Sequence, residues 1–257
     1  MQNGSTLSVC IVTYNSENKI SAAVSSLKKE TVGIDYKLYV FDNGSSDNTK
    51  DAVLSADSDA VFTENNANLG FGKANNLVIP KLDSKYLAIV NPDIRLDSDV
   101  LTDICDYLDE HEDTVLVTPK VLFPDGREQH LPKLRPRFVY LLARRTPFFK
   151  KIAKEYTMED RTITEPCEID QCSGCFAVIR SEVFKAIGGF DERFFMYMED
   201  ADLTLRAKKL GKTVYLPQFH VIHEWERSSS KSLKYLMIHI SSMFKFLWKH
   251  RKERRTF

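Results

Sequence analysis

Two stretches carry carboxylates at places where a chain could present them to a metal ion or to a substrate. Asn91-Pro92-Asp93 ends a short apolar run, and an amide and a carboxylate are hard oxygen ligands of the kind that Mg²⁺ and Mn²⁺ prefer. Pro92 has a fixed φ and pushes the residue before it toward extended geometry, so Asp93 should project from a strand end. The alternative is an ordinary strand-end turn.

The second stretch, Glu199-Asp200-Ala201-Asp202, follows an aromatic run and opens a predicted helix. Acids are common at a helix start because the helix dipole favours them there. One carboxylate could instead accept a proton from a substrate hydroxyl. Repulsion from Glu199 and Asp202 would then raise the pKa of Asp200, which would suit a base that works near neutral pH.

Further polar residues follow other apolar runs. Thr13-Tyr14-Asn15 and Asp42-Asn43 each end such a run, and they could frame a nucleoside or serve only as turns. His223 follows a later strand and could complete a metal site with Asp93 as a neutral imidazole, although a single histidine is more often structural.

The elements that must position these residues alternate between strand and helix. A continuous apolar run is typical of a strand buried on both faces, and helical spacing of apolar residues follows it. The alternation predicts an α/β fold with a mostly parallel central sheet, flanked by helices, whose strand ends share one edge. A G-x-G-x-x-G motif is missing after the first run, which argues against a dinucleotide-binding domain. The expected strands are Leu7–Thr13, Tyr36–Phe41, Ala60–Thr63, Tyr86–Val90 and Val115–Thr118.

The second half is less regular. Pro124-Asp125-Gly126 predicts a hairpin turn, and Ser98 is a candidate cap for a helix that runs through about Leu108. A strand with Gly174 inside it is expected at Ile169–Arg180, and another strand at Thr213–Leu216. Helices are expected at Ser181–Ile187, Glu199–Leu210 and Leu233–Trp248.

The charge is balanced overall but unevenly distributed. The 257 residues contain 36 Lys and Arg and 36 Asp and Glu, yet residues 131–155 and 231–257 each hold eight basic residues and one acidic residue. Apolar residues repeat at helical spacing within the second basic segment, which predicts a basic amphipathic helix. These segments point to an anionic membrane surface, and the apolar stripe would also suit a homodimer. Nucleic acid is disfavoured because no recognised binding module accompanies the charge.

Cysteine usage and hydropathy point to a cytoplasmic protein. Five cysteines at irregular spacing do not predict a disulfide framework, and Cys172-x-x-Cys175 lacks the second ligand pair of a zinc site, so apolar packing is favoured. No signal peptide is expected, because no basic region precedes the first apolar run. No run of about 18 apolar residues predicts a membrane span. We therefore expect a peripheral protein at the inner face of the cell membrane.

Taken together, the motifs resemble family 2 glycosyltransferases of the GT-A fold, in the branch that contains bacterial dTDP-rhamnosyltransferases. The resemblance covers about residues 7–228 and implies a GT-A domain at 1–228, with a nucleotide-binding half at about 1–120 and an acceptor half at 121–228. Residues 229–257 would form the basic helix and tail. The motifs that carry it, in order, are SVCIVTYN from Ser8, FDNGSSDNT from Phe41, NLGFGKANN from Asn68, Asn91-Pro92-Asp93, GGFDE from Gly188, EDADL from Glu199, and His223.

The resemblance implies an inverting, metal-assisted sugar transfer from a nucleoside diphosphate sugar. Asp200 matches the general base, Asp93 a ligand of Mg²⁺ or Mn²⁺, and His223 a position that reaches the metal or the diphosphate in some members. Asn91 stands where the family has an Asp, which leaves its contact with the metal open. Glu199 and Asp202 lie beside the base. The residues implied in donor binding are Thr13, Tyr14, Asn15, Asp42, Asn43, Gly70, Gly72, Lys73, Asn91 and Asp93.

The leading hypothesis is transfer of rhamnose from dTDP-rhamnose to a lipid-linked or growing cell-envelope glycan. The first alternative is a transferase for UDP-hexose or UDP-N-acetylhexosamine on the same fold. A nucleotidyltransferase is disfavoured, because it needs a Gly-rich basic motif that Thr13 to Asn15 does not supply. A non-catalytic module that binds nucleotide sugars is disfavoured by Asp93 and Asp200.

Overall fold

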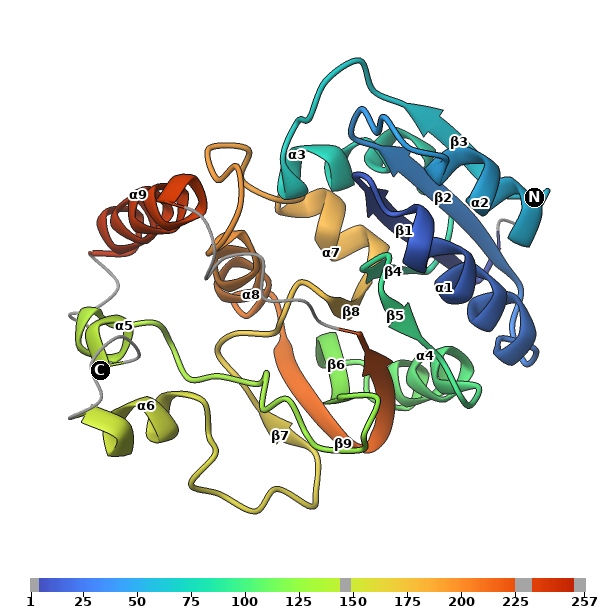
Figure 1. Cartoon of the computed structure of the whole chain (residues 1–257). Coiled ribbons are helices and arrows are strands. Elements are labelled where there is room, and N and C mark those ends of the chain that lie inside the picture. The colour runs from blue at the N-terminus through green and yellow to red at the C-terminus, as the bar shows by residue number, and fades with distance from the viewer. Residues whose placement is uncertain (1–4, 144–148, 225–232, 252–257) are drawn as a thin grey trace.

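The computed structural model describes residues 5–143, 149–224 and 233–251. Within these ranges a single sheet of nine strands runs through the molecule, with strand order β3-β2-β1-β4-β8-β6-β9-β5 and with β7 paired to β9 (Figure 1). None of the helices in these ranges combines the length and the apolarity needed to cross a bilayer.

The first half of the sheet is parallel, as predicted. β1 (Leu7–Thr13) pairs in parallel with β2 (Tyr36–Asp42) and β4 (Tyr86–Val90), and β3 (Val61–Glu64) adds to β2. The expected bounds of β1 and β4 are confirmed. The connecting helices are α1 (Glu17–Glu30), α2 (Thr49–Ala56) and α3 (Phe71–Asn76).

The core has two layers because alternate residues of a strand face opposite sides of a sheet. Leu7, Val9 and Ile11 of β1 join one apolar cluster with α1, α2 and α4 (Val100–Glu110), while Cys10 joins a second cluster with α7 (Ser181–Ala186). The uninterrupted apolar runs in the sequence follow from this burial on both faces.

The second half of the sheet is mixed. β8 (Phe176–Arg180) runs antiparallel to both β4 and β6 (Thr114–Leu122), and β6 pairs in parallel with β9 (Lys212–His223). The short strands β5 (Ile94–Arg95) and β7 (Cys167–Glu168) both run antiparallel to β9. The Pro124-Asp125-Gly126 turn is confirmed by the hydrogen bond from Gly126 N to Phe123 O (2.9 Å).

Three sequence expectations need correction. The strand predicted at Ile169–Arg180 is limited to Phe176–Arg180, and residues 169–175 form a buried turn around Gly174. β9 extends well beyond the predicted Thr213–Leu216, because β6 and β5 supply partners along its length. The cap of α4 is Asp99 rather than Ser98, since the Asp99 carboxylate accepts from Thr102 N and also binds the amides of Val32 and Gly33.

The remaining helices lie beside the second half of the sheet (Figure 1). They are α5 (Phe138–Ala143), α6 (Lys150–Tyr156), α8 (Glu199–Ala207) and α9 (Leu233–Lys249). α9 packs on α8 through Phe246, which is buried with Phe194, Met198, Ala201 and Leu205. The predicted amphipathic helix is therefore present and is attached to the helix that carries Asp200.

Candidate active site

Asp93 and His223 meet although 130 positions separate them. β5 begins directly after Asp93 and pairs antiparallel with the end of β9, in a register that sets Ile94 opposite His223. The Asp93 backbone oxygen accepts from Glu224 N (3.0 Å), which extends the ladder by one step. The pairing brings His223 Nε2 to 3.3 Å from Asp93 Oδ1.

Gln129 determines which nitrogen of His223 carries the proton. The Gln129 amide nitrogen donates to the backbone oxygens of Leu122 and His223, so its oxygen faces the imidazole Nδ1 at 2.9 Å. An amide oxygen can only accept, so Nδ1 must donate, and the neutral ring then presents a lone pair at Nε2. Because Asp93 Oδ1 is also an acceptor, a neutral His223 ring sets two lone pairs face to face across 3.3 Å, a gap that a cation would fill.

This pair fits a divalent cation. Both atoms are buried, and neither has a hydrogen-bond partner among the described residues. Cis ligands of an octahedral Mg²⁺ or Mn²⁺ ion lie about 3 Å apart, since each bond is about 2.1 Å long. Among the described residues no three His, Cys, Asp or Glu side chains cluster as a metal site. Asp93 and His223 would therefore supply two ligands and leave other positions for phosphate oxygens and water, as is usual for Mg²⁺.

Asp200 lies in the first turn of α8 and is held by two donors. Its Oδ1 accepts from Ala201 N (2.7 Å) and from Gln171 Nε2 (3.3 Å). The orientation of Gln171 is fixed because its amide oxygen accepts from the hydroxyl of Tyr156 (2.7 Å). The carboxylate is thus positioned from its own helix and from the 169–175 turn.

The backbone before Asp200 has an uncommon conformation. Tyr197 and Met198 have φ of 70° and 68°, a left-handed region that non-glycine residues seldom adopt. Two such residues in succession turn the chain sharply from the aromatic run into α8. Strained backbone of this kind persists when the surrounding packing imposes it, and it concentrates at functional sites.

Glu199, directly before Asp200, is buried and has a raised pKa. Burial, and then the charge of Asp200, hold the pKa of Glu199 well above the ordinary range of a glutamate. Its Oε2 has no hydrogen-bond partner among the described residues. A carboxyl in this environment favours the protonated form.

The side chain of Asp202 contacts α9 and Arg206, and its expected effect on Asp200 stays a prediction. Its side chain is fully buried and contacts Arg206 Nε (2.7 Å), Lys249 Nζ (2.6 Å) and His250 Nε2 (2.8 Å). Burial alone would raise the pKa of Asp202, but the hydrogen bond from His250 and the charges of Arg206 and Lys249 outweigh it and leave the pKa lowered. Because Lys249 and His250 contact this carboxylate, it anchors α9.

The ends of β1 and β2 form one hydrogen-bonded unit. Asp42 accepts from the Thr13 hydroxyl (2.8 Å), from the Ser45 amide (2.8 Å) and hydroxyl, and from Gly44 N (3.2 Å). Asn15 accepts from Ser46 N and has a positive φ of 50°, while Tyr14 is half exposed. These bonds show Asp42 shaping the turn; its contact with a nucleoside stays a prediction.

Gly70, which precedes α3, and Gly72 in its first turn are explained by close contacts with residues 190–195, and the loop predicted before Lys73 ends earlier, at Gly70. A Cβ on Gly70, whose φ is +83°, would lie 2.4 Å from Phe195 O, and one on Gly72 would lie 2.9 Å from the Phe190 side chain. The amide of Asn43 donates to Gly70 O (3.1 Å) and holds the loop to the end of β2. Lys73 lies 3.7 Å from the Glu192 carboxylate.

The turn at residues 172–175 separates Asp93 from Asp200. Asn91 N donates to Cys175 O (2.8 Å), and a Cβ on Gly174 would lie 3.6 Å from the Asp200 Cβ. Burial raises the pKa of the Cys175 thiol to about 12, and the charges of Asp93 and Asp200 add to this effect. Both cysteines of the C-x-x-C stretch are buried and free, so the packing interpretation is the better one.

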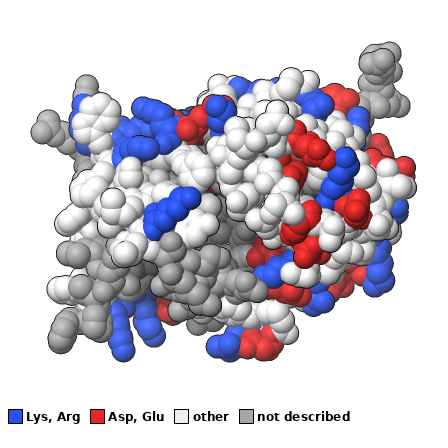
Figure 2. Space-filling view, turned by 45° about the horizontal axis from the view of Figure 1, so that its top comes forward, with Lys and Arg blue, Asp and Glu red and all other residues white. Residues whose placement is uncertain are grey.

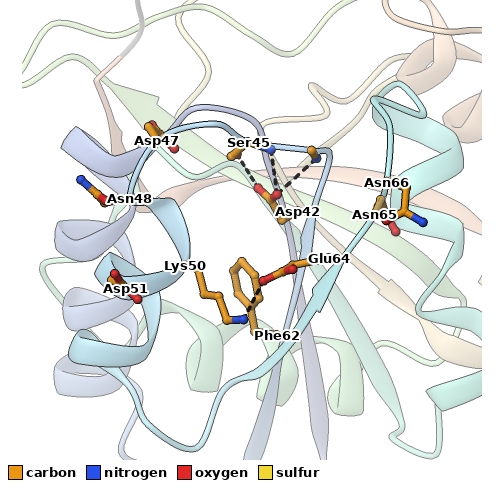
Figure 3. A pocket seen from close by; sticks show the side chains of 11 residues that line it. Asp42, Ser45, Asp47, Asn48, Lys50, Asp51, Phe62, Glu64, Asn65 and Asn66 are labelled. Atoms are coloured by element: carbon orange, nitrogen blue, oxygen red, sulfur yellow. Dashed lines mark hydrogen bonds and ion pairs between the residues drawn. The ribbon is translucent and has the colours of Figure 1, made fainter.

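A pocket of about 320 Å³, partly lined by Asp42, lies between α2 and β3 (Figure 3). Asp47, Asp51 and Glu64 line it, and its lysine, Lys50, is paired with Glu64 at 2.6 Å. This acidic lining would repel a diphosphate. The edge that holds Asp93 is therefore the better candidate for the anionic part of a ligand.

Sequence reasoning missed the two glutamines that orient the site. Gln129 reaches His223 because the hairpin after β6 folds back, with Gln129 N bonded to Val121 O, and Gln171 lies in the turn that was predicted as strand. Neither residue belongs to a periodic pattern or to a motif. The hairpin turn before Gln129 was the one available signal.

Comparisons with known proteins identify the family. The family model described as "Glycosyl transferase family 2" matches residues 8–188, more than half of the chain. The N-acetylglucosaminyl-diphospho-decaprenol L-rhamnosyltransferase of Mycobacterium tuberculosis is 28% identical over 94% of this chain and 83% of its own length. The rhamnosyltransferase WbbL of Escherichia coli is 28% identical over 95% of this chain and 93% of its own length.

Among solved structures, GalNAc-T7 with UDP, GalNAc and Mn²⁺ has a TM-score of 0.65 at 16% identity, over 96% of this chain. This chain spans 48% of the length of that one, so the likeness concerns the fold alone. The predicted GT-A fold is confirmed by this match. The chain belongs to glycosyl transferase family 2 and is a glycosyltransferase.

Proposed function

We propose that the protein transfers rhamnose, with inversion, from dTDP-rhamnose to a lipid-linked or growing cell-envelope glycan, assisted by Mg²⁺ or Mn²⁺. The facing lone pairs of Asp93 Oδ1 and His223 Nε2 at 3.3 Å carry the proposal for a metal. The similarity to two rhamnosyltransferases over most of the chain supports the sugar and the kind of acceptor.

We assign the donor to the strand ends of the first half, about residues 1–120. Thr13, Tyr14 and Asn15 would frame the nucleoside together with the turn that Asp42 and Asn43 shape. The loop with Gly70, Gly72 and Lys73 would lie near the ribose and the diphosphate. Asn91 and Asp93 would face the diphosphate from the end of β4, and residues 121–228 would form the acceptor half.

The chemistry follows from the positions of the charges. A divalent cation held by Asp93 and His223 would offset the charge that develops on the diphosphate as the sugar bond breaks. Asp200 would take the proton of the acceptor hydroxyl as that oxygen attacks the anomeric carbon. Attack opposite the leaving diphosphate inverts the anomeric configuration. Gln171 would keep Asp200 aimed during this step, since its own amide is fixed by Tyr156.

We propose that this reaction takes place at the cytoplasmic face of the cell membrane, where the lipid part of the acceptor would be embedded. The Mycobacterium tuberculosis relative is named for a decaprenol-linked acceptor, which supports a lipid-linked substrate here. An anionic bilayer surface is then the expected partner of the basic segments.

The test is release of nucleoside diphosphate from dTDP-rhamnose, UDP-glucose, UDP-galactose and UDP-N-acetylglucosamine, each with Mg²⁺, Mn²⁺ or EDTA. Membranes with a lipid-linked glycan pool would be added so that an acceptor is present. We expect metal-dependent release from dTDP-rhamnose, with Asp200→Asn lowering it by about 10²- to 10⁴-fold, the usual contribution of a general base. Release from a UDP-sugar alone would replace the rhamnosyl assignment, and release that both EDTA and Asp200→Asn leave unchanged would refute the mechanism.

A further inference from the structure

One face of α9 is apolar and exposed. Leu233, Met237, Phe244 and Trp248 are spaced by four, seven and four residues, so they lie on one side of the helix. Their exposed fractions are 80%, 70%, 58% and 65%, and nothing in the described part of the chain covers them. We call these four residues the α9 stripe.

The opposite face of α9 is fixed to the catalytic half. Ser242 donates to Met196 O and Lys245 to Arg193 O, each at 2.8 Å, while Phe246 is buried against α8. At the end of the helix, Lys249 and His250 contact the buried carboxylate of Asp202. Asp202 lies two residues after Asp200, so the direction of the α9 stripe is fixed relative to the proposed base.

Cationic side chains border the α9 stripe. Lys234 is exposed at its start, and Arg251 is exposed at its end, with the guanidinium 4.1 Å from the centre of the Trp248 ring. In Figure 2 most of the Asp and Glu lie on the right of the molecule, whereas Lys and Arg lie on both sides. A second copy of the chain would bring like charges together at this face, whereas an anionic surface would complement them.

The same side of the molecule offers further exposed aromatic residues. Phe138 in α5 and Phe149 before α6 are about half exposed, and Lys150 and Lys151 are exposed at the start of α6. α5, α6 and α9 lie on the side away from β3 (Figure 1). The segment before α5 touches the end of α9 through Arg135 Nη2 and His250 O (3.5 Å).

We propose that the α9 stripe, together with the exposed residues of α5 and α6, inserts into the headgroup region of an anionic phospholipid bilayer and sets the orientation of Asp200 relative to the membrane. Trp, Phe and Leu on one face with Lys and Arg at its border is the composition of helices that lie in this interface. The orienting role rests on the proposed function; the docking itself rests only on this surface.

The test is co-sedimentation of the full-length protein with vesicles at low salt, either of phosphatidylglycerol and phosphatidylcholine or of phosphatidylcholine alone. We expect binding to the anionic vesicles and about tenfold or greater weakening in Phe244→Ser/Trp248→Ser, since each side chain loses apolar burial. Val32→Ser and Leu210→Ser are matched controls, because these apolar residues are exposed elsewhere, and both should bind like the wild type. Thermal unfolding verifies that all variants fold.

Three results would overturn the docking surface. The wild type does not sediment with anionic vesicles, the double variant binds them as well as the wild type does, or sedimentation velocity shows a dimer that the double variant abolishes. Release of nucleoside diphosphate from dTDP-rhamnose, assayed without vesicles but with the lipid-linked glycan pool in detergent as acceptor, keeps the two proposals apart. Docking without release would refute only the proposed function, and release without docking would refute only this inference.

Discussion

Two carboxylates, the partly buried Asp93 and the fully buried Asp202, have very different partners in the fold. Asp93 faces one nitrogen of His223, whose other nitrogen contacts the Gln129 amide oxygen, and none of the ion pairs among the described residues joins Asp93 to a Lys or Arg. Asp202 faces Arg206, Lys249 and His250, so its charge is compensated within the chain. The first arrangement favours a cation from outside, and the second stabilises the fold. Burial alone therefore does not identify a functional carboxylate; the identity of its partners does.

The largest expected effect is the loss of folding stability when Asp202 is replaced. Asp202→Asn leaves Arg206 and the buried His250 without their carboxylate, while Lys249 keeps its pair with Asp191, and breaking a buried ion pair in this way costs about 3–5 kcal/mol. Urea unfolding at neutral pH measures it. Asp113→Asn is the control, because its pair with Lys212 is at the surface and should contribute little. Equal stability of the two variants would show that the Asp202 cluster does not hold α9.

Asp93, which we propose as a metal ligand, should affect turnover rather than stability. Asp93→Asn should lower turnover by about 10²- to 10³-fold, the scale of losing one preorganised electrostatic contact. Its stability in urea should not fall, because the change removes a buried charge that faces a lone pair. Mn²⁺ binding, followed by electron paramagnetic resonance, should be lost as well. A variant that unfolds more easily but still binds Mn²⁺ would reverse the comparison.

A further test concerns Gln129, the hydrogen-bond partner of His223. Gln129→Leu removes the acceptor of the Nδ1 proton, and loss of such a partner commonly weakens metal affinity by about 10- to 100-fold. Mn²⁺ titration and the ¹⁵N chemical shifts of the His223 ring measure affinity and tautomer separately. Gln171→Leu is the matched control, since that glutamine orients Asp200. The control should lower turnover while Mn²⁺ affinity stays unchanged, and the same loss of affinity in both variants would argue against a specific role for Gln129.

The smallest expected effect is on the pH dependence of folding stability, to which Asp202 and Glu199 of α8 should contribute in opposite directions. Asp202 has a lowered pKa, so its stabilisation is present above the pKa of an unfolded Asp and is lost as the pH falls through the lowered value. Glu199 has a raised pKa, so it stabilises the fold below the pKa of an unfolded Glu and loses this effect as the pH rises through the raised value.

Urea unfolding from pH 4 to 8 tests Glu199. Relative to Glu199→Gln, the wild type should lose stability as the pH rises above about 4.3, by no more than about 1.4 kcal/mol per pH unit for one proton. Parallel curves for the wild type and the variant would show that Glu199 is ionised in the folded protein.

Local patterns in the sequence determined much of the architecture and part of the site. The apolar runs at Leu7–Thr13 and Tyr86–Val90 gave strands with those bounds, because burial on both faces favours apolar residues at successive positions. Pro92 ended one of these strands and placed Asp93 at its edge, and Asp200 fell in the first turn of a helix, as acids there predict. Each of these features depends on neighbours within a few positions.

Only the tertiary structure decided how these carboxyl groups are partnered. Asp202 meets His250 across 48 positions, and His223 meets Gln129 across 94, through a helix packing and a hairpin that local periodicity does not encode. The strand predicted at Ile169–Arg180 begins only at Phe176; before it, Gln171 forms an isolated bridge with Lys133, and Gly174 lies close to Phe71 and Asp200. The sequence therefore identifies the carboxyl groups, but the folded chain determines which partner each of them contacts.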